Sequence, residues 1–472
     1  MIKRYSEDYL RQWYSKKNRK PLVIRGARQV GKSTLVREFS KNCGHSLLEV
    51  NLEKHLNMED VFKRLNTAEI LSEISLITGK PLNAKSGDIL FLDEIQATPS
   101  AIPALRYLYE EKPELHVVAA GSLLEFTLKD HNYSMPVGRI EYLYLGPILF
   151  FEYVTAKNSG HLVSYIQKYN FEEDFSQEAH QQLCTLLREY IIIGGMPEAV
   201  AVYLDAEDMT QALQVHHSIL DTYRNDFNKY ATGTALQRIQ RVYSYVPAAT
   251  GEKFKYSNVN PAWQAREIRS AVDLLDHAGV IFKVHCTSGA GIPLDANADN
   301  KVFKTYFLDV GLMNTASGMK SLSRDEFLSA RFVNEGKMAE QFIAQHLRFE
   351  KEMYIRPQLH YWLREKRKSN AEIDFLIQSG RVPIPVEVKA GKSGGLKSLH
   401  LFCAMYNLHN AVRFDLNKPS TLNCSHKISM GDKTANVTYK LVNFPLYMVE
   451  EVRRIDAFSC ANLKLIRKRG LC

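Results

Sequence analysis

The stretch Gly26-Ala27-Arg28-Gln29-Val30-Gly31-Lys32-Ser33 decides the fold of the N-terminal part of this 472-residue chain. It follows a short apolar run, Leu22-Val23-Ile24, and leads into a helical apolar pattern at Leu35, Val36 and Phe39. Two glycines let the backbone turn so that successive N–H groups point inward, and the start of the following helix adds partial positive charge there. The spacing G-x-x-x-x-G-K-S between a strand and a helix therefore predicts a loop that binds nucleotide phosphates.

The side chains of this phosphate loop have separate expected roles. Lys32 is expected to reach the β- and γ-phosphates, and the hydroxyl of Ser33 is expected to complete a Mg²⁺ shell. The alternative is a glycine turn with an accidental Lys-Ser pair, which the agreement of motif and context disfavours. The predicted nucleotide contacts are Gly26, Ala27, Arg28, Gln29, Val30, Gly31, Lys32, Ser33, Thr34 and Ser122.

Two acids close a second apolar run, Asp88-Ile89-Leu90-Phe91-Leu92-Asp93-Glu94-Ile95. A continuous hydrophobic run is typical of a strand buried on both faces, and side chains at its carboxyl end project into the ligand crevice of a parallel sheet. We therefore expect Asp93 to bind Mg²⁺ through water, and Glu94 to orient and deprotonate the attacking water. A plain helix cap is the alternative, and the upstream phosphate loop makes it the weaker interpretation.

Two further polar residues are candidates for contact with the γ-phosphate. Ser122 follows a third predicted strand, Leu115–Ala120, and is a candidate sensor, although capping of the next helix is an equal alternative. Arg139 is the candidate arginine that reaches the γ-phosphate of a neighbouring subunit, with a plain surface arginine as its alternative. Strand and helix periods alternate through this region, which predicts a parallel α/β sheet.

The composition is that of an ordinary globular protein, with 45% hydrophobic and 24% charged residues. The length suggests roughly two to four domains. The formal net charge of +9 is compatible with polyanionic partners, and a solvated basic surface explains it equally well. Seven scattered cysteines indicate neither disulfides nor a metal site, and no apolar run approaches the ~18 residues of a membrane span. We expect a cytoplasmic protein that does not enter a membrane.

Residues from about 156 to 235 are predicted to be helical, because Leu183, Leu187 and Tyr190 recur at helical spacing. The pair Gly194-Gly195 is expected to stop one helix, and Pro197 suits the first turn of the next. A plain helix break without nucleotide contact stays open as an alternative.

Five motifs together resemble the AAA-type ATP-binding proteins of bacteria and archaea that carry an uncharacterised C-terminal domain. These motifs are Gly26–Ser33, Leu92–Gln96, Ala120–Leu124, Gly138-Arg139 and Gly194–Glu198. The resemblance implies a P-loop fold of the additional-strand, catalytic-glutamate type, with a helical lid over the nucleotide. It places Lys32, Ser33, Asp93 and Glu94 at the positions for phosphate, metal and water activation. Ser33 stands where threonine is more usual, and either hydroxyl can bind the metal.

Between about 236 and 330 the pattern resembles the outline of a winged helix-turn-helix. A helix is predicted between Pro261 and Gly279, and strands are predicted at Ile281–Cys286 and Val302–Leu308. Such a unit places a helix in a DNA groove and steadies it with the hairpin. The predicted helix carries acids as well as arginines, so a protein-contact or spacer role is equally weighted.

Two strands of a hairpin are predicted further on, at Glu372–Ile377 and Pro383–Lys389. If the turn is centred on Gly380-Arg381, residues pair when their numbers sum to 761, which sets Asp374 opposite Glu387. Opposed carboxylates repel unless a divalent cation lies between them. Mg²⁺ or Mn²⁺ held there could polarise a phosphodiester, with Lys389 on the same face to position the water.

This D…E-x-K pattern resembles that of the PD-(D/E)XK nucleases. The candidate catalytic residues are Asp374, Glu387 and Lys389, and Glu340, on a preceding helix, is a candidate to complete the metal shell. Ile373 stands where the family usually has proline, which leaves activity open. The alternative is an exposed hairpin with a cross-strand salt bridge. Basic residues at 364–368 and in the tail could track a phosphate backbone or simply be solvated.

The predicted fold class is α/β: a three-layer P-loop ATPase with a parallel sheet, a helical lid, a winged-helix-like connector and a restriction-endonuclease-like α/β domain. The expected boundaries are 1–155 for the ATPase core, 156–235 for the lid, 236–330 for the connector, 331–450 for the nuclease-like domain and 451–472 for a basic tail. We expect Mg²⁺-dependent ATP hydrolysis coupled to a domain that binds or cuts DNA or RNA, with further copies of the chain as partners. The alternative is a nucleotide-switched scaffold with an inactive nuclease-like domain.

Overall fold

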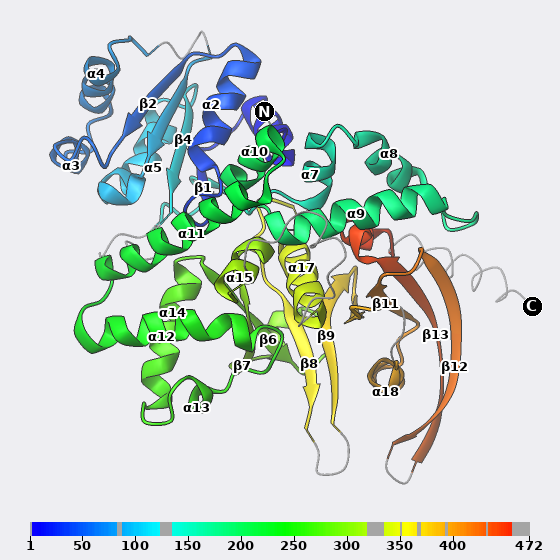
Figure 1. Cartoon of the computed structure of the whole chain (residues 1–472). Coiled ribbons are helices and arrows are strands. Elements are labelled where there is room, and N and C mark those ends of the chain that lie inside the picture. The colour runs from blue at the N-terminus through cyan, green and yellow to red at the C-terminus, as the bar shows by residue number, and fades with distance from the viewer. Residues whose placement is uncertain are drawn as a thin grey trace, which may run out of the picture.

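The computed structural model describes residues 2–82, 87–122, 135–318, 335–349, 352–365, 370–391, 395–430 and 433–455. These residues form two sheets, one of five strands and one of eight, with helices around and between them (Figure 1). In the described ranges, no helix is long and apolar enough to cross a membrane. The basic residues 366–368 and the tail beyond residue 455 lie outside the described residues.

The smaller sheet is parallel throughout, with the strand order β2-β3-β4-β1-β5. Its strands are β1 (Leu22–Arg25), β2 (Leu47–Asn51), β3 (Ile89–Asp93), β4 (His116–Gly121) and β5 (Glu141–Tyr144). β4 lies between β1, which precedes the phosphate loop, and β3, which ends in Asp93. The parallel α/β sheet is confirmed, and it has the additional strand that the resemblance implies.

Helices cover both faces of this sheet. They are α1 (Tyr5–Tyr14), α2 (Lys32–Cys43), α3 (Met58–Lys63), α4 (Thr67–Thr78) and α5 (Ala101–Glu111). Successive strand residues face opposite sides of a sheet. Ile24 and Phe91 accordingly belong to one buried apolar cluster, and Val23 and Leu92 belong to another. Because both faces of the sheet are buried, its strands have continuous apolar sequences. The domain therefore has three layers, with the sheet between two layers of helices.

The apolar segment from 142 to 153 divides into two elements. β5 ends at Tyr144, and α7 (Phe150–Ala156) begins six residues later. Between them, Pro147 has no N–H to donate, and the N–H of Ile148 donates to the carbonyl of Gly195 at 2.7 Å. The chain therefore leaves the sheet here and contacts the helices that follow.

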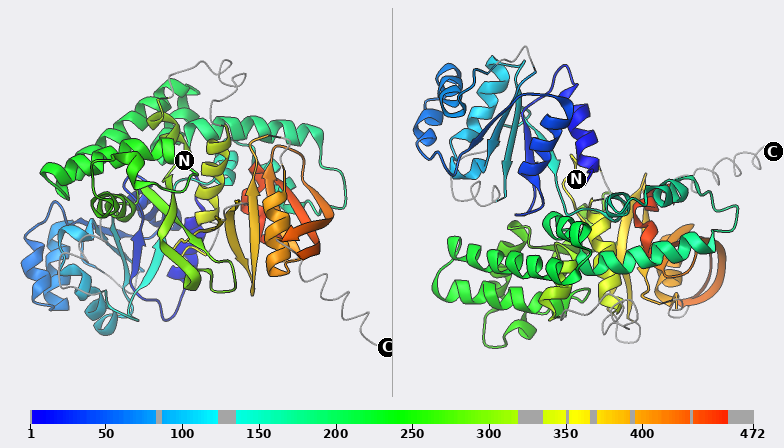
Figure 2. Two further views of the ribbon diagram at one scale, coloured as in Figure 1. Left: turned by 90° about the horizontal axis from the view of Figure 1, so that it is seen from below. Right: turned by 45° about the horizontal axis from the view of Figure 1, so that its top comes forward.

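The region from 156 to 235 is helical, as predicted, and its later helices, drawn in green, lie between the two sheets in Figure 1 and in the right view of Figure 2. They are α8 (Gly160–Lys168), α9 (Gln177–Ile193), α10 (Pro197–Ala206) and α11 (Met209–Asp226). α9 ends before Gly194, which has a φ of 66°, and α10 starts at Pro197. The predicted break at Gly194-Gly195 is confirmed.

The connector contains three helices, a hairpin and a further helix. These are α12 (Gly233–Ala249), α13 (Tyr256–Val259), α14 (Ala265–His277), β6 (Ile281–Thr287), β7 (Ala298–Phe307) and α15 (Val310–Ala316). β6 and β7 are antiparallel, as expected of a hairpin. However, β6 also pairs with β8 in parallel, through His285 with His360 and Cys286 with Tyr361. The hairpin is therefore not a free wing, because it is part of the larger sheet.

The larger sheet has the strand order β12-β13-β11-β10-β9-β8-β6-β7, so it runs across the expected boundary near residue 330. Its remaining strands are β8 (His360–Arg364), β9 (Ala371–Ser379), β10 (Val382–Val388), β11 (Asn410–Asp415), β12 (Ser420–Met430) and β13 (Lys433–Pro445). Two helices, α17 (Glu335–Phe349) and α18 (Lys397–Tyr406), and the 3-10 helix Leu446–Arg454 accompany them.

The hairpin of β9 and β10 has the predicted register. Its pairs run from Val382 with Ser379 to Val386 with Phe375, and all sum to 761. The turn lies at Gly380, whose φ of 56° is a conformation that glycine adopts easily. Asp374 and Glu387 follow immediately beyond the last pair.

Candidate nucleotide site and a buried acidic cluster

The phosphate loop joins β1 to α2 and encloses the ammonium group of Lys32. The Lys32 Nζ donates to the carbonyl oxygens of Gly26 at 3.0 Å and Ala27 at 2.7 Å. A Cβ on Gly26 would lie 2.3 Å from the carbonyl oxygen of Leu145, so only glycine fits there. Lys32 is 8% exposed, and its burial lowers the pKa of the ammonium to about 8. The lysine is therefore held inside the loop by neutral acceptors.

Ser33 and Asp93 meet at the carboxyl edge of the smaller sheet. The Ser33 Oγ lies 2.9 Å from each carboxylate oxygen of Asp93. Burial raises the pKa of Asp93, while the hydrogen bond from Ser33 acts in the opposite direction. A hydroxyl and a carboxylate side by side are oxygen ligands of the kind Mg²⁺ takes, with phosphate oxygens and water completing its shell. These residues fit the predicted metal site.

Glu94, Ser122 and Arg28 lie around this pair. Glu94 has a left-handed backbone, with a φ of 53°, and its carboxylate accepts a hydrogen bond from the side-chain amide of Gln96. The Arg28 Nε lies 3.5 Å from the Ser122 Oγ, which connects the phosphate loop to the end of β4. The candidate base and the candidate sensor thus lie at the ends of adjacent strands, near the phosphate loop.

The helices α10 and α11, which fall in the predicted lid, touch the phosphate loop at two places. Arg28 Nη1 lies 2.7 and 2.5 Å from the carboxylate oxygens of Asp226 on α11, and the Tyr223 hydroxyl donates to the Arg28 carbonyl at 2.9 Å. A Cβ on Gly31 would lie 3.4 Å from the Pro197 ring. The turn at Gly194–Pro197 is therefore adjacent to the loop. Sequence reasoning missed Asp226 and Tyr223, which belong to no motif.

A second group of charged residues lies in the larger sheet. Asp374 is on β9, Glu387 is at the end of β10, and Glu340 is on α17. The N–H of Val388 donates to Asp374 Oδ2 at 2.8 Å, and Lys389 donates to Glu387 Oε1. Burial raises the pKa of Asp374, and the charges of Glu340 and Glu387 add to this. The structure thus brings together the residues predicted from the D…E-x-K pattern.

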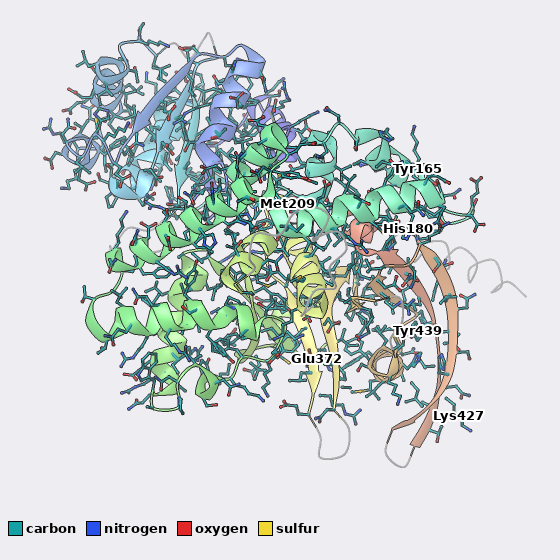
Figure 3. All side chains as sticks on the ribbon, viewed as in Figure 1. Tyr165, His180, Met209, Glu372, Lys427 and Tyr439 are labelled. Carbon is teal, nitrogen blue, oxygen red and sulfur yellow. The ribbon has the colours of Figure 1, made fainter. Side chains whose placement is uncertain are left out.

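Lys304, on β7, lies among these acids and was not expected there from the sequence. Its Nζ is 2.9 Å from Glu340 Oε1, 2.5 Å from Glu372 Oε1 and 3.9 Å from Asp374 Oδ1, and the side chain is fully buried. The Tyr306 hydroxyl also donates to Glu340 Oε1, at 2.5 Å. Figure 3 labels Glu372 on the yellow strands. The only available hint was a lysine and a tyrosine alternating on one face of an apolar strand.

With Lys304 in this position, the acidic cluster does not fit a divalent cation. Across the described residues, no three His, Cys, Asp or Glu side chains are arranged to hold a metal ion. A Mg²⁺ ion requires oxygen ligands about 2.0–2.1 Å away, and the Lys304 ammonium already lies between Glu340, Glu372 and Asp374. The alternative of an exposed cross-strand salt bridge also fails, because Glu387 is 7% exposed and pairs with Lys389, two residues further along the chain.

Three family models match successive parts of the chain. Residues 18–154 match an AAA domain, residues 184–323 match a domain of unknown function (DUF8612), and residues 335–441 match another (DUF4143). The N-terminal part is an AAA-type P-loop ATPase domain. A comparison with curated proteins found no match.

Solved structures that resemble the chain include the ORC2 protein of Aeropyrum pernix, in ADPNP and ADP complexes. It is 13% identical, with 67% of this chain and 93% of that chain covered and a TM-score of 0.31. The RuvB Holliday junction branch migration motor of Thermotoga maritima is 14% identical, with 60% and 90% covered and a TM-score of 0.29.

Arg139 of the ATPase domain lies away from the phosphate loop of its own chain. Arg139 precedes β5, whose first residue, Glu141, pairs with Leu22 at the start of β1. Arg139 therefore lies at the edge of the sheet opposite to the phosphate loop, which follows the end of β1. Its side chain is 44% exposed, and its Nε donates to Glu110 at 2.7 Å. Contact with a nucleotide therefore requires a second subunit, and this role stays a prediction.

A cavity of about 290 Å³ lies between the ATPase domain and the larger sheet. Arg25, Gly26 and Ser122 line it on one side, and Lys283 and Arg348 on the other. Beside it, a Cβ on Gly279, after α14, would lie 3.2 Å from the Cβ of Ala27. The connector thus contacts the phosphate loop directly.

Proposed function

We propose that the chain is a Mg²⁺-dependent ATPase whose nucleotide cycle controls a C-terminal, restriction-endonuclease-like domain that binds nucleic acid. The observation that carries the ATPase assignment is the contact between Ser33 and Asp93, at 2.9 Å, beside the buried ammonium of Lys32. A phosphate-binding lysine, a metal-binding hydroxyl and an acid on the neighbouring strand are the parts that phosphoryl transfer to water requires.

In this proposal Lys32 exchanges its two backbone acceptors for oxygens of the β- and γ-phosphates. Ser33 and Asp93 would hold Mg²⁺, and the bound ion would neutralise charge on the phosphates. Glu94 accepts a proton from the water that attacks the γ-phosphate, and ADP and phosphate are the products. The hydrogen bond from Gln96 fixes the Glu94 carboxylate beforehand.

A continuous set of contacts supports coupling between the two regions. Pro197 packs on Gly31 of the phosphate loop, and the N–H of Gly195, two residues earlier, donates to the buried carboxylate of Asp309 at 2.6 Å. Gln345 of α17 donates to the same Asp309 oxygen at 3.2 Å. A displacement of the lid by ATP therefore acts directly on α17, which covers the larger sheet and carries Glu340.

The element order of the C-terminal region supports the nuclease-like assignment. α17, β8, β9, β10, α18 and β11 follow one another as helix, three antiparallel strands, helix and parallel strand. The acid of the motif lies on β9, and the E-x-K lies at the end of β10. We assign DNA or RNA as the partner of this domain, with the helices α12–α14 beside it.

The location of Lys304 favours a second candidate function. With an ammonium among the acids, this conformation does not hold a catalytic metal at that place. The second candidate is therefore a nucleotide-switched scaffold whose nuclease-like domain is inactive. The two functions differ in whether wild-type protein ever cleaves nucleic acid.

The test combines two measurements on the full chain. ATP turnover is measured with and without DNA, and DNA retention is measured by gel shift with and without ATP. We expect Mg²⁺-dependent turnover and DNA binding that changes with nucleotide. Absence of turnover in the presence and absence of DNA contradicts the ATPase assignment, and absence of DNA and RNA binding contradicts the C-terminal assignment.

A further inference from the structure

We propose that the cavity between the ATPase domain and the larger sheet binds a phosphate dianion, held by the guanidinium groups of Arg348 and Arg356. Neither arginine belongs to a motif of the sequence. The ligand is either the phosphate that leaves the ATP site, a source that rests on the proposed ATPase function, or the phosphate group of a small molecule from solution.

Three parts of the chain form the walls of this cavity. Gly26 and Ser122 belong to the ATPase domain, and Lys283 lies on β6. Arg348 lies in the last turn of α17, and Arg356 lies in the segment before β8. The volume of about 290 Å³ is close to the lower end of the range of about 300–1,000 Å³ that is usual for small-molecule sites. The cavity therefore suits a small ligand and not a nucleic-acid duplex.

The charges around the cavity leave an excess of two positive charges when the histidines are neutral. Each of its two carboxylates is already engaged. Asp276 Oδ2 lies 3.4 Å from Lys283 Nζ, and Asp295 Oδ1 lies 3.4 Å from His360 Nε2. Among the described residues, no carboxylate forms an ion pair with Arg348 or Arg356. The charged residues of the lining are Arg25, Lys283, Arg348 and Arg356, against Asp276 and Asp295.

Aromatic rings hold the guanidinium of Arg348 at the cavity. Its central carbon lies 4.5 Å from the ring centre of Phe282 and 5.7 Å from that of Phe349. Its Nε is buried and, within the ranges that the structure describes, has no hydrogen-bond partner. A buried N–H without an acceptor costs free energy, and an anion in the cavity would supply the acceptor.

The two arginines also disfavour each other's charge. Burial lowers the pKa of the Arg348 guanidinium to about 10; the charge of Asp276 opposes this shift, and the charge of Arg356 adds to it. Both guanidinium groups stay charged at neutral pH, so their repulsion persists. An anion that binds to both removes the repulsion, and the planar fork of donors on arginine suits the oxygens of phosphate.

A histidine adds a third group to the cavity. Burial lowers the pKa of His285, and the charge of Lys283 acts in the same direction, so the imidazole is neutral at pH 7. The His285 Nδ1 is buried and, among the residues described, has no hydrogen-bond partner. In the tautomer with the proton on Nδ1, it donates to a phosphate oxygen without adding charge. Two excess positive charges and three donor groups match a dianion with several oxygens better than a carboxylate, which has one charge and two oxygens.

The cavity adjoins the proposed ATP site. Gly26 and Ala27 of the phosphate loop line it, as does Ser122, whose Oγ lies 3.5 Å from Arg28 Nε. Phosphate released by hydrolysis therefore has a short route to the two arginines, and a phosphorylated small molecule would enter from solution. The same chemistry recognises the ligand in both cases.

The first measurement is titration calorimetry of inorganic phosphate into the full chain carrying Lys32→Ala, so that the phosphate loop does not supply a second anion site. We expect one phosphate per chain. Adding Arg348→Met or Arg356→Met should weaken binding about tenfold or more, because charge-assisted hydrogen bonds are lost. Arg266→Met, at an exposed arginine of α14 outside the cavity lining, is the matched control and should bind phosphate as the parent chain does.

Two results contradict the proposal: no saturable phosphate binding by the Lys32→Ala chain, or equal binding by that chain after both Arg348→Met and Arg356→Met are added. Removal of the Arg348 charge is not expected to unfold the protein, because no carboxylate of the described residues pairs with it. If Arg348→Met nevertheless does not fold, Arg356→Met decides, since Arg356 is exposed and its replacement leaves the interior unchanged. Unweakened binding by Arg356→Met then contradicts the proposal.

The second measurement identifies the source of the phosphate, in a single turnover of the wild-type chain and of Arg356→Met. Cleavage of ATP is followed by rapid quench, and free phosphate is followed by a fluorescent phosphate sensor. If the ATP site is the source, free phosphate lags behind cleavage in wild type, and the lag disappears in Arg356→Met. If free phosphate keeps pace with cleavage in both proteins while phosphate binding depends on the arginines, the ligand comes from solution.

The result is separable from the proposed function. The calorimetry uses a chain that is not expected to hydrolyse ATP, so it remains valid if wild type shows no turnover. Arginine-dependent phosphate binding without any ATP turnover by wild type supports the anion site and contradicts the ATPase assignment. Normal turnover without phosphate binding to the Lys32→Ala chain contradicts the anion site alone.

Discussion

Two buried lysines, one in each half of the molecule, have opposite surroundings. Lys32 in the ATPase domain donates to backbone carbonyls, and burial lowers the pKa of its ammonium to about 8. Burial also opposes the charged form of Lys304, but Glu340, Asp374 and Glu372 together raise its pKa. The ammonium of Lys32 has no anionic partner and is available to bind one from outside, whereas the ammonium of Lys304 already pairs with carboxylates of the protein.

The largest expected effect concerns the lysine that lacks anionic partners. Lys32→Ala should lower ATP turnover by about 10³-fold and weaken ATP binding, because the phosphates lose their buried positive charge. Turnover is measured by phosphate release and binding by a fluorescent ATP analogue. Lys41→Ala, an exposed lysine at the end of the same helix α2, is the control and should match wild type. Full turnover by Lys32→Ala would show that this lysine is not the phosphate ligand.

A smaller loss is expected from a change at Glu94, the proposed base near Lys32. Glu94→Gln should lower turnover by about 10²-fold while ATP still binds, because an amide cannot accept the proton of the attacking water. Single-turnover hydrolysis and equilibrium binding separate these two effects. Equal losses of binding and turnover would instead assign Glu94 to nucleotide binding.

The two lysines should also differ in stability. Lys304→Met leaves carboxylates without their cation and should cost about 3–5 kcal/mol of unfolding free energy. Lys32→Met removes a charge whose burial is uncompensated and should change stability by less than about 1 kcal/mol, or increase it. Urea denaturation followed by circular dichroism compares them, with Lys301→Met as the surface control. Equal destabilisation by both substitutions would contradict the inferred difference between the surroundings of the two lysines.

The buried acid that links the two regions predicts a pH dependence. Burial raises the pKa of Asp309 from 3.8 to about 6. Since the folded-state pKa is the higher one, the contribution of Asp309 to stability is greatest below pH 3.8 and is lost as the pH rises through about 6. The loss amounts to roughly 3 kcal/mol.

Urea denaturation across this pH range, for wild type and Asp309→Asn, isolates the effect. The difference in unfolding free energy between the two proteins should shift against wild type as the pH rises, whatever the constant cost of the amide. A difference that does not vary between pH 4 and 7 means that Asp309 titrates normally, and it would remove the electrostatic part of the link.

The local features of both sites were predictable from sequence. The register of β9 and β10 followed from the Gly380 turn and strand alternation, because a short turn fixes which residues pair. The meeting of Ser33 with Asp93 followed from two motifs at the carboxyl ends of parallel strands. In each case the deciding chemistry lies within a few residues of the side chains concerned.

The partners of distant residues were not predictable. Lys304 meets Glu340, and Arg28 meets Asp226 across 198 residues of chain. These pairs depend on how helices and strands pack, and single charged residues give no periodic signal of it. The pairing of β6 with β8 was missed for the same reason. The sequence of an edge strand does not specify which other strand will pair with it.

The smallest effect is expected where α11, part of the proposed lid, contacts the phosphate loop. Arg28 and Asp226 form a pair whose side chains are 20% and 10% exposed, so the ion pair is only partly screened by water. Asp226→Asn should loosen α11 from the loop and speed release of a fluorescent ADP analogue by about fivefold. This change in rate is equivalent to about 1 kcal/mol. Asp221→Asn, in an exposed pair with Arg224 on the same helix, is the matched control and should leave release unchanged. Unchanged release in Asp226→Asn would mean that the lid does not restrain the nucleotide through Arg28, and that the contact of Pro197 with Gly31 carries the coupling instead.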